Sequence, residues 1–69
     1  MLNWNPRKIA VFRVSAELSQ AELAQRMDVN TTTICRWETG VSLPSIAKTL
    51  ALAHELGRDI NDFLDATED

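Results

Sequence analysis

Apolar residues recur along this chain at the three- and four-residue spacing of amphipathic helices. Five segments follow the pattern, and each is bounded by helix-capping residues or by glycine. The predicted helices run from Asn5-Pro6 to about residue 17, from Ser19 to 28, from Asn30 to 39 and from Pro44-Ser45 to 56, with a short last helix after Asp59. No segment alternates apolar and polar residues as a strand does, so the sequence predicts an all-α fold of five helices.

The predicted core consists of the apolar side chains that share one face of each helix. These are Ile9, Phe12 and Ala16, then Leu23, Ala24 and Met27, then Ile34 and Trp37, then Ile46, Leu50, Ala53 and Leu56. In the last helix, Ile60, Phe63 and Leu64 either close this core or are shared between two copies of the chain. Such a core suits a single domain spanning residues 1–69.

The net charge of −3 at pH 7 at first argues against a nucleic-acid partner. The charges are unevenly distributed, however. Residues 1–58 carry all seven Lys and Arg against five Asp and Glu, whereas residues 59–69 carry the other five acids. This asymmetry is consistent with a basic body and an acidic C-terminal end held away from DNA, or with charges that only keep a small protein soluble.

Several classes of protein are excluded by what the sequence lacks. No apolar run approaches the roughly 18 residues of a membrane span, and the N-terminal residues do not resemble a signal peptide. Cys35 has no second cysteine to pair with, and His54 has no second histidine to complete a metal site. No catalytic constellation appears. We therefore expect a cytoplasmic protein that is not an enzyme and has no metal, cofactor, membrane or small-molecule substrate.

Residues 20–37 meet the requirements of a helix-turn-helix, in which two short helices cross through a turn of three or four residues. Ala24 supplies the small side chain needed at the crossing, and Asp28 stands where the turn favours glycine. The second helix has an outward face that is free to meet DNA, and it consists of Thr31, Thr32, Cys35 and Arg36.

The chain resembles the Cro and phage-repressor family, the XRE-type helix-turn-helix proteins. The resemblance rests on Leu18-Ser19-Gln20-Ala21-Glu22-Leu23-Ala24, Val29-Asn30-Thr31-Thr32-Thr33-Ile34, Arg36-Trp37-Glu38-Thr39-Gly40, Pro44-Ser45 and Leu52-Ala53-His54-Glu55-Leu56-Gly57. It extends from about residue 9 to residue 64. It implies a compact, five-helix, lambda-repressor-like domain that binds a palindromic operator in double-stranded DNA as a homodimer.

The resemblance also implies which side chains read the bases. Gln20 corresponds to a glutamine that contacts phosphate and often a base edge or a neighbouring side chain. Thr31 and Thr32 occupy the main base-reading positions, and Arg36 occupies a third. Arginine can pair with O6 and N7 of guanine, and threonine offers a hydroxyl and a methyl group.

Other matched positions are expected to hold the DNA backbone or the scaffold. Thr33, Thr39 and Ser42 are candidate phosphate contacts, as is the backbone at the start of the second helix. Arg13 and Glu38 match a pair that forms an internal salt bridge in the family, which implies a structural role.

The chain departs from the family at several positions. Glu17 and Asp28 stand where glycine is usual, so the junction between the first two helices is expected to be built differently. The loop Val41-Ser42-Leu43-Pro44 lacks the Lys and Arg of relatives, which predicts a shallow salt dependence of DNA binding. Val11 and Val14 lie off the apolar face, where they either cover Trp4 or form a protein contact.

Two functions are consistent with these features. The first is a sequence-specific transcriptional regulator, expected to be a repressor, that inserts its third helix into the major groove. The second is a protein-interaction module on the same fold, similar to an antitoxin or a subunit of an assembly. The uncharged loop, the acidic end and the two valines favour the second, and the reading positions favour the first.

Overall fold

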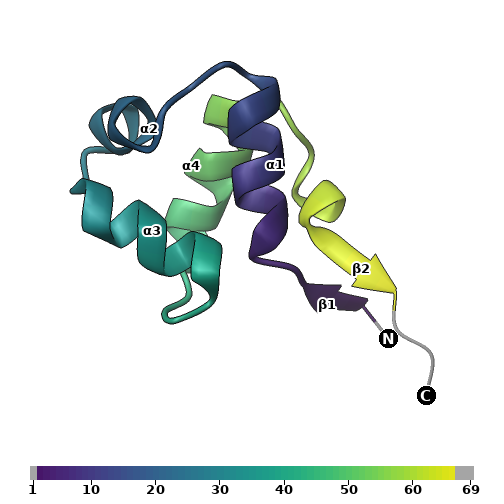
Figure 1. Cartoon of the computed structure of the whole chain (residues 1–69). Coiled ribbons are helices and arrows are strands. Elements are labelled where there is room, and N and C mark those ends of the chain that lie inside the picture. The colour runs from purple at the N-terminus through teal and green to yellow at the C-terminus, as the bar shows by residue number, and fades with distance from the viewer. Residues whose placement is uncertain (1, 67–69) are drawn as a thin grey trace.

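The computed structural model describes residues 2–66, so the end of the predicted acidic segment at Glu68 and Asp69 lies outside the described residues. In chain order the elements are β1 (Leu2–Trp4), α1 (Arg7–Ser15), α2 (Gln20–Met27), α3 (Thr31–Thr39), α4 (Ile46–Leu56), the 3-10 helix η1 (Ile60–Phe63) and β2 (Leu64–Ala66). Helices dominate the described part, as predicted. Figure 1 shows α2 and α3 on one side of α1, with the two strands at the opposite end of the molecule.

Side-chain caps explain why three of the helices begin where the sequence predicted. Ser19 accepts from the backbone N–H of Glu22, and the Glu22 carboxylate accepts in return from the Ser19 N–H at 3.0 Å. The hydrogen bond from the Ser19 N–H, followed by the contact with the Ser19 side chain, holds the pKa of the Glu22 carboxyl below its ordinary value. Asn30 and Ser45 cap α3 and α4 in the same way, each accepting from the N–H three residues later.

The connection between α1 and α2 corrects one expectation. Glu17 adopts a left-handed conformation with φ of +60°, as Asp28 does after α2 with φ of +57°. The junction is therefore built with the backbone that glycine favours, and Glu17 bears a strain of about 1 kcal/mol. Gly40 also has positive φ, and a Cβ there would lie 3.3 Å from Pro6, so the end of α3 packs against the start of α1.

The all-α helix-turn-helix fold class is confirmed, but the expected count of five helices and the expected absence of strands are not. β1 pairs with β2 in an antiparallel sheet, with Leu2 opposite Ala66 and Trp4 opposite Leu64. The predicted fifth helix is a single 3-10 turn, η1. Asp65 in β2 accepts from Asn5 at 2.6 Å and pairs with Lys8 at 3.3 Å. Both contacts lower the pKa of Asp65, the Asn5 hydrogen bond being the larger cause.

One cluster of buried side chains forms the core, contributed by α1, α2, α3, α4 and η1. Phe63 is the core residue nearest the C-terminus. Its ring stacks on that of Trp4, with the ring centroids 5.2 Å apart, and meets the ring of Phe12 edge-on, with the centroids 5.0 Å apart. Phe63 therefore closes the core within one copy of the chain. Arg58 lies over the ring of Phe12, with its guanidinium carbon 4.4 Å from the ring centroid.

Three predicted core residues are exposed instead. Ala16 lies past the end of α1, and Ile46 and Leu50 face outward from α4. The buried face of α4 consists of Leu52, Ala53 and Leu56. Because α4 has apolar residues on two faces, its periodicity alone did not reveal which one meets the core.

Candidate nucleic-acid interface

The motif predicted at residues 20–37 forms from α2, a three-residue turn and α3. Ala24 is buried where the two helices pack together, and its carbonyl accepts from the N–H of Val29 in the turn at 3.0 Å. Because Asp28 has left-handed geometry, the chain reverses within three residues and Asn30 can cap α3 at once. The local sequence thus fixes the position of α3 relative to α2.

The two faces of α3 differ in exposure and in chemistry. Ile34 and Trp37 are buried and anchor the helix to the core. Thr31, Thr32 and Arg36 are exposed along the opposite side. Within residues 2–66 the Arg36 guanidinium forms no ion pair, so its donors face solvent. The structure therefore brings the three predicted reading residues onto one open face of α3.

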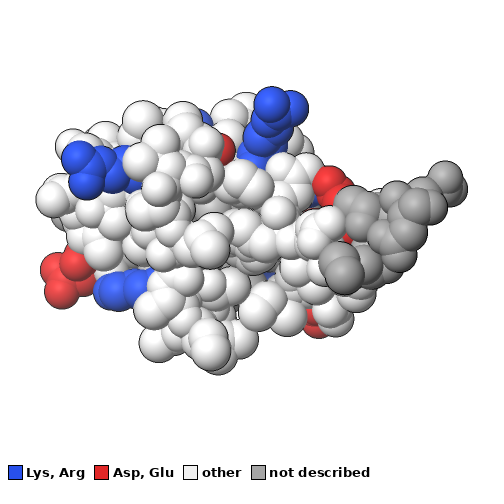
Figure 2. Space-filling model, turned by 90° about the horizontal axis from the view of Figure 1, so that it is seen from below, with Lys and Arg blue, Asp and Glu red and all other residues white. Residues whose placement is uncertain are grey.

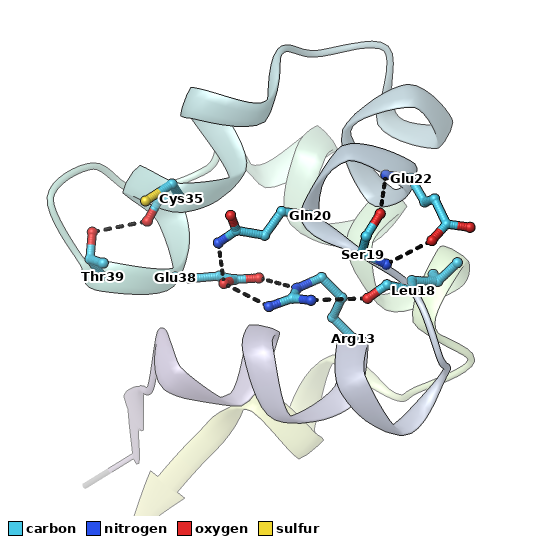
Figure 3. A network of polar contacts seen from close by, with 8 residues as sticks. All are labelled: Arg13, Leu18, Ser19, Gln20, Glu22, Cys35, Glu38 and Thr39. Atoms are coloured by element: carbon cyan, nitrogen blue, oxygen red, sulfur yellow. Dashed lines mark hydrogen bonds and ion pairs between the residues drawn. The ribbon is translucent and has the colours of Figure 1, made fainter.

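Gln20 is linked to the scaffold by a buried polar network, drawn in Figure 3. Arg13 on α1 pairs with Glu38 on α3, with Nε 2.6 Å from Oε2, and it also donates to the carbonyl of Leu18. Glu38 Oε1 accepts a hydrogen bond of 2.9 Å from the Gln20 side-chain amide. The side-chain oxygen of Gln20 is left as an acceptor, and one amide hydrogen is left as a donor.

The three candidate phosphate contacts have different surroundings. The hydroxyl of Thr33 donates to Asn30 at 2.8 Å, and that of Thr39 donates to the Cys35 carbonyl at 2.9 Å. Each hydroxyl has only one proton, so either contact with a phosphate oxygen would have to replace an existing hydrogen bond. Ser42 lies in the exposed loop after α3, and within residues 2–66 its hydroxyl makes no hydrogen bond.

The sequence did not reveal the hydrogen bond from Gln20 to Glu38, which joins residues 18 positions apart. The family resemblance allowed Gln20 a neighbouring side chain but did not say which one. The expected pair of Arg13 with Glu38 was the one sequence feature that could have indicated this hydrogen bond. A carboxylate held by arginine retains lone pairs for a further donor. Gln20 is thereby tied to the packing of α1 against α3.

The described residues offer little for other chemistry. Residues 2–66 contain no cluster of His, Cys, Asp and Glu suited to a metal ion. Nor is any helix in that range long and apolar enough to cross a membrane. Cys35 is exposed beside Arg36, and Val11 and Val14 both remain more than half exposed, so Trp4 does not cover them.

Comparison with known proteins agrees with this geometry. The family model described as helix-turn-helix matches residues 9–63. Among solved structures, the chain is similar to the P22 c2 repressor in a crystal structure with a synthetic operator, with a TM-score of 0.82, 23% identity, and coverage of 94% of this chain and 98% of the other. No curated protein sequence matches significantly. The chain belongs to the Cro and phage-repressor type of the helix-turn-helix family, whose members are DNA-binding regulators of transcription.

Proposed function

We propose that this protein is a homodimeric repressor that binds a palindromic operator and reads it with α3 in the major groove. The observation that carries the proposal is the division of α3 into a buried apolar face and an exposed face of Thr31, Thr32 and Arg36. A helix of this kind can enter the major groove without exposing its anchor residues. The two threonines lie at its N-terminal end, which meets base edges in helix-turn-helix proteins.

The start of α2 provides the proposed contact with the DNA backbone. Within residues 2–66 the backbone N–H groups of Gln20 and Ala21 make no hydrogen bond, and they point from the N-terminus of an eight-residue helix. A helix N-terminus favours an anion through its dipole and its unpaired donors. The remaining amide hydrogen of Gln20 adds a donor at the same end. Ser42, in the loop that follows the C-terminal end of α3, is the second proposed contact with the DNA backbone.

Replacing Arg36 by alanine is expected to weaken binding to the preferred duplex by about 1–3 kcal/mol, because a bidentate pair with a base is lost. Binding to random DNA should change far less. The matched control is Arg26→Ala, since Arg26 is an exposed arginine on α2 that lies outside the proposed reading face. Fluorescence anisotropy at fixed salt measures the affinity of each variant for the labelled preferred duplex and for labelled random DNA. If the two variants lose affinity equally on both duplexes, Arg36 contributes only through its charge and does not read a base.

The alternative function, a protein-interaction module, is favoured by the exposed Val11 and Val14 on α1. The two functions differ in their response to salt. A DNA-binding domain should be retained on immobilised duplex DNA at low salt and released as the salt concentration rises. The uncharged loop 41–44 makes the proposed slope shallow but not zero. Retention that does not depend on salt, or no retention at all, would favour the protein-interaction module.

A further inference from the structure

One face of α1 is exposed and apolar at its centre. Val11 and Val14, one turn apart, keep 54% and 64% of their surface exposed. Arg7 lies one turn before Val11 on the same face and is also exposed. The opposite face of α1 supplies Ile9 and Phe12 to the core. The core therefore does not account for the exposed face of this helix.

A charged residue follows this face at the C-terminal end of α1. The N–H of Glu17 donates to the carbonyl of Val14 at 2.9 Å, and the Glu17 side chain is exposed. We call Arg7, Val11, Val14 and Glu17 the α1 stripe. Within residues 2–66 the side chains of Arg7 and Glu17 make no hydrogen bond and no ion pair. Both charges are therefore available to a partner.

Local stability does not explain these two charges. A helix favours acids near its N-terminus and bases near its C-terminus. Arg7, in the first turn of α1, and Glu17, just beyond the last turn, each lie at the unfavourable end. Glu17 also bears the cost of a left-handed backbone, with φ of +60°. Because neither cost benefits the single copy, the two charges point to a contact outside it.

We infer that the α1 stripe binds the α1 stripe of a second copy of this chain, with the two helices antiparallel. In a two-fold contact, residue i of one copy meets residue j of the other, and j meets i. The midpoint of Arg7 and Glu17 falls at residue 12, and the midpoint of Val11 and Val14 falls between residues 12 and 13. The two midpoints thus differ by about 1 Å along the helix. A two-fold axis there brings the valines together and sets each arginine level with the glutamate of the other copy.

The distribution of charge supports a second copy as the partner. Residues 2–16 contain no acid, and residues 14–25 contain no base, so the two ends of α1 have opposite charge. An antiparallel copy meets each end with the opposite sign, and the two helix dipoles attract each other in the same arrangement. Figure 2 shows the molecule from below, where isolated Lys and Arg side chains lie on a largely uncharged surface. No dense basic patch on that face would favour a highly acidic partner instead.

The contact does not depend on the proposed function. Neither α2 nor α3 contributes a residue to the α1 stripe. Helix α1 meets α3 through its other side, where Arg13 pairs with Glu38. Self-association through the α1 stripe can therefore be measured without DNA.

Charge reversal tests the contact. Arg7→Glu and Glu17→Arg should each weaken self-association at least about tenfold, because like charges then face each other. A mixture of the two variants, and the variant that carries both changes, should associate as the unmodified chain does, since every facing pair is again opposite. Arg36→Glu is the matched control, because it makes the same change of charge on the exposed face of α3 and should have no effect. Sedimentation equilibrium without DNA measures association, at up to about 1 mM protein because the stripe is small.

Thermal unfolding separates the contact from the fold. Arg7→Glu places an acid in the first turn of α1, so a single copy of this variant should be no less stable than the unmodified chain. Association restored in the mixture supports the α1 contact even if no duplex is bound, and in that case the proposed function alone fails. The inference is overturned by an unmodified chain that stays monomeric, by single variants that associate unchanged, or by a mixture in which association is not restored.

Discussion

Replacing Glu38 by alanine is expected to lower the free energy of unfolding by about 3–5 kcal/mol. The side chains of Arg13 and Glu38 are only 14% and 7% exposed, so the variant leaves a guanidinium buried without its counter-ion. The amide of Gln20 loses its acceptor as well. Since a domain of this length is stable by about 3–10 kcal/mol, the variant should be partly or wholly unfolded. Urea unfolding followed by circular dichroism measures the change.

The surface ion pair between Arg26 and Glu55 provides the control. Its nitrogen and oxygen are 4.0 Å apart, and the Arg26 side chain is 54% exposed. Glu55→Ala should cost about 1 kcal/mol or less, because solvent screens such a pair. Glu38→Gln keeps the shape and an acceptor oxygen, so it should unfold at a lower urea concentration than the unmodified chain but still fold. If Glu38→Ala costs no more than Glu55→Ala, the network is not the buried structural unit described above.

Replacing Phe63 by alanine is the second large change, with an expected loss of about 3–5 kcal/mol. The ring of Phe63 is fully buried between Trp4 and Phe12, and the Phe63 carbonyl accepts from the N–H of Asn5 at 2.8 Å. Removing the ring leaves a cavity between Trp4 of β1 and Phe12 of α1. The loss should therefore include the packing of β1 and β2 as well as the core.

Phe63→Leu is the matched variant, because leucine fills most of the space, and it should lose clearly less stability than Phe63→Ala. Tryptophan fluorescence during urea unfolding reports on both ends of the molecule, since Trp4 stacks on Phe63 and Trp37 lies in α3. We expect one transition for both probes. A loss of less than about 1 kcal/mol for Phe63→Ala would mean that the terminal segment does not belong to the cooperative core.

Local chemistry made much of the fold predictable. The caps at Ser19, Asn30 and Ser45 act within three residues, so the sequence shows where their helices begin. The antiparallel pair of β1 and β2 lies beyond such reasoning. It joins Leu2 to Ala66, each strand has only three residues, and so short a segment cannot display a period of two.

For the candidate site, the sequence predicted which residues are exposed but not the hydrogen bonds that their neighbours make. Family position identified Thr31, Thr32 and Arg36 as outward residues, and the structure exposes all three. Sequence position could not reveal where hydroxyl protons go, and those of Thr33 and Thr39 are donated within α3 and its cap.

Helix α4 shows the same limit. Ile46 and Leu50 fit the helical period as well as the buried residues of α4 do, and only the packing of α4 against the core reveals which face is exposed.

The proposed function requires that the exposed face of α3 reads a palindromic DNA sequence. Selection of bound duplexes from a random DNA pool tests it most directly, because it requires no assumption about the operator. We expect an enriched palindrome with half-sites about one helical turn apart, bound about 1,000-fold more tightly than a scrambled duplex at the same salt concentration. A pool that shows no enrichment, or a selected duplex bound no better than its scrambled version, would contradict it.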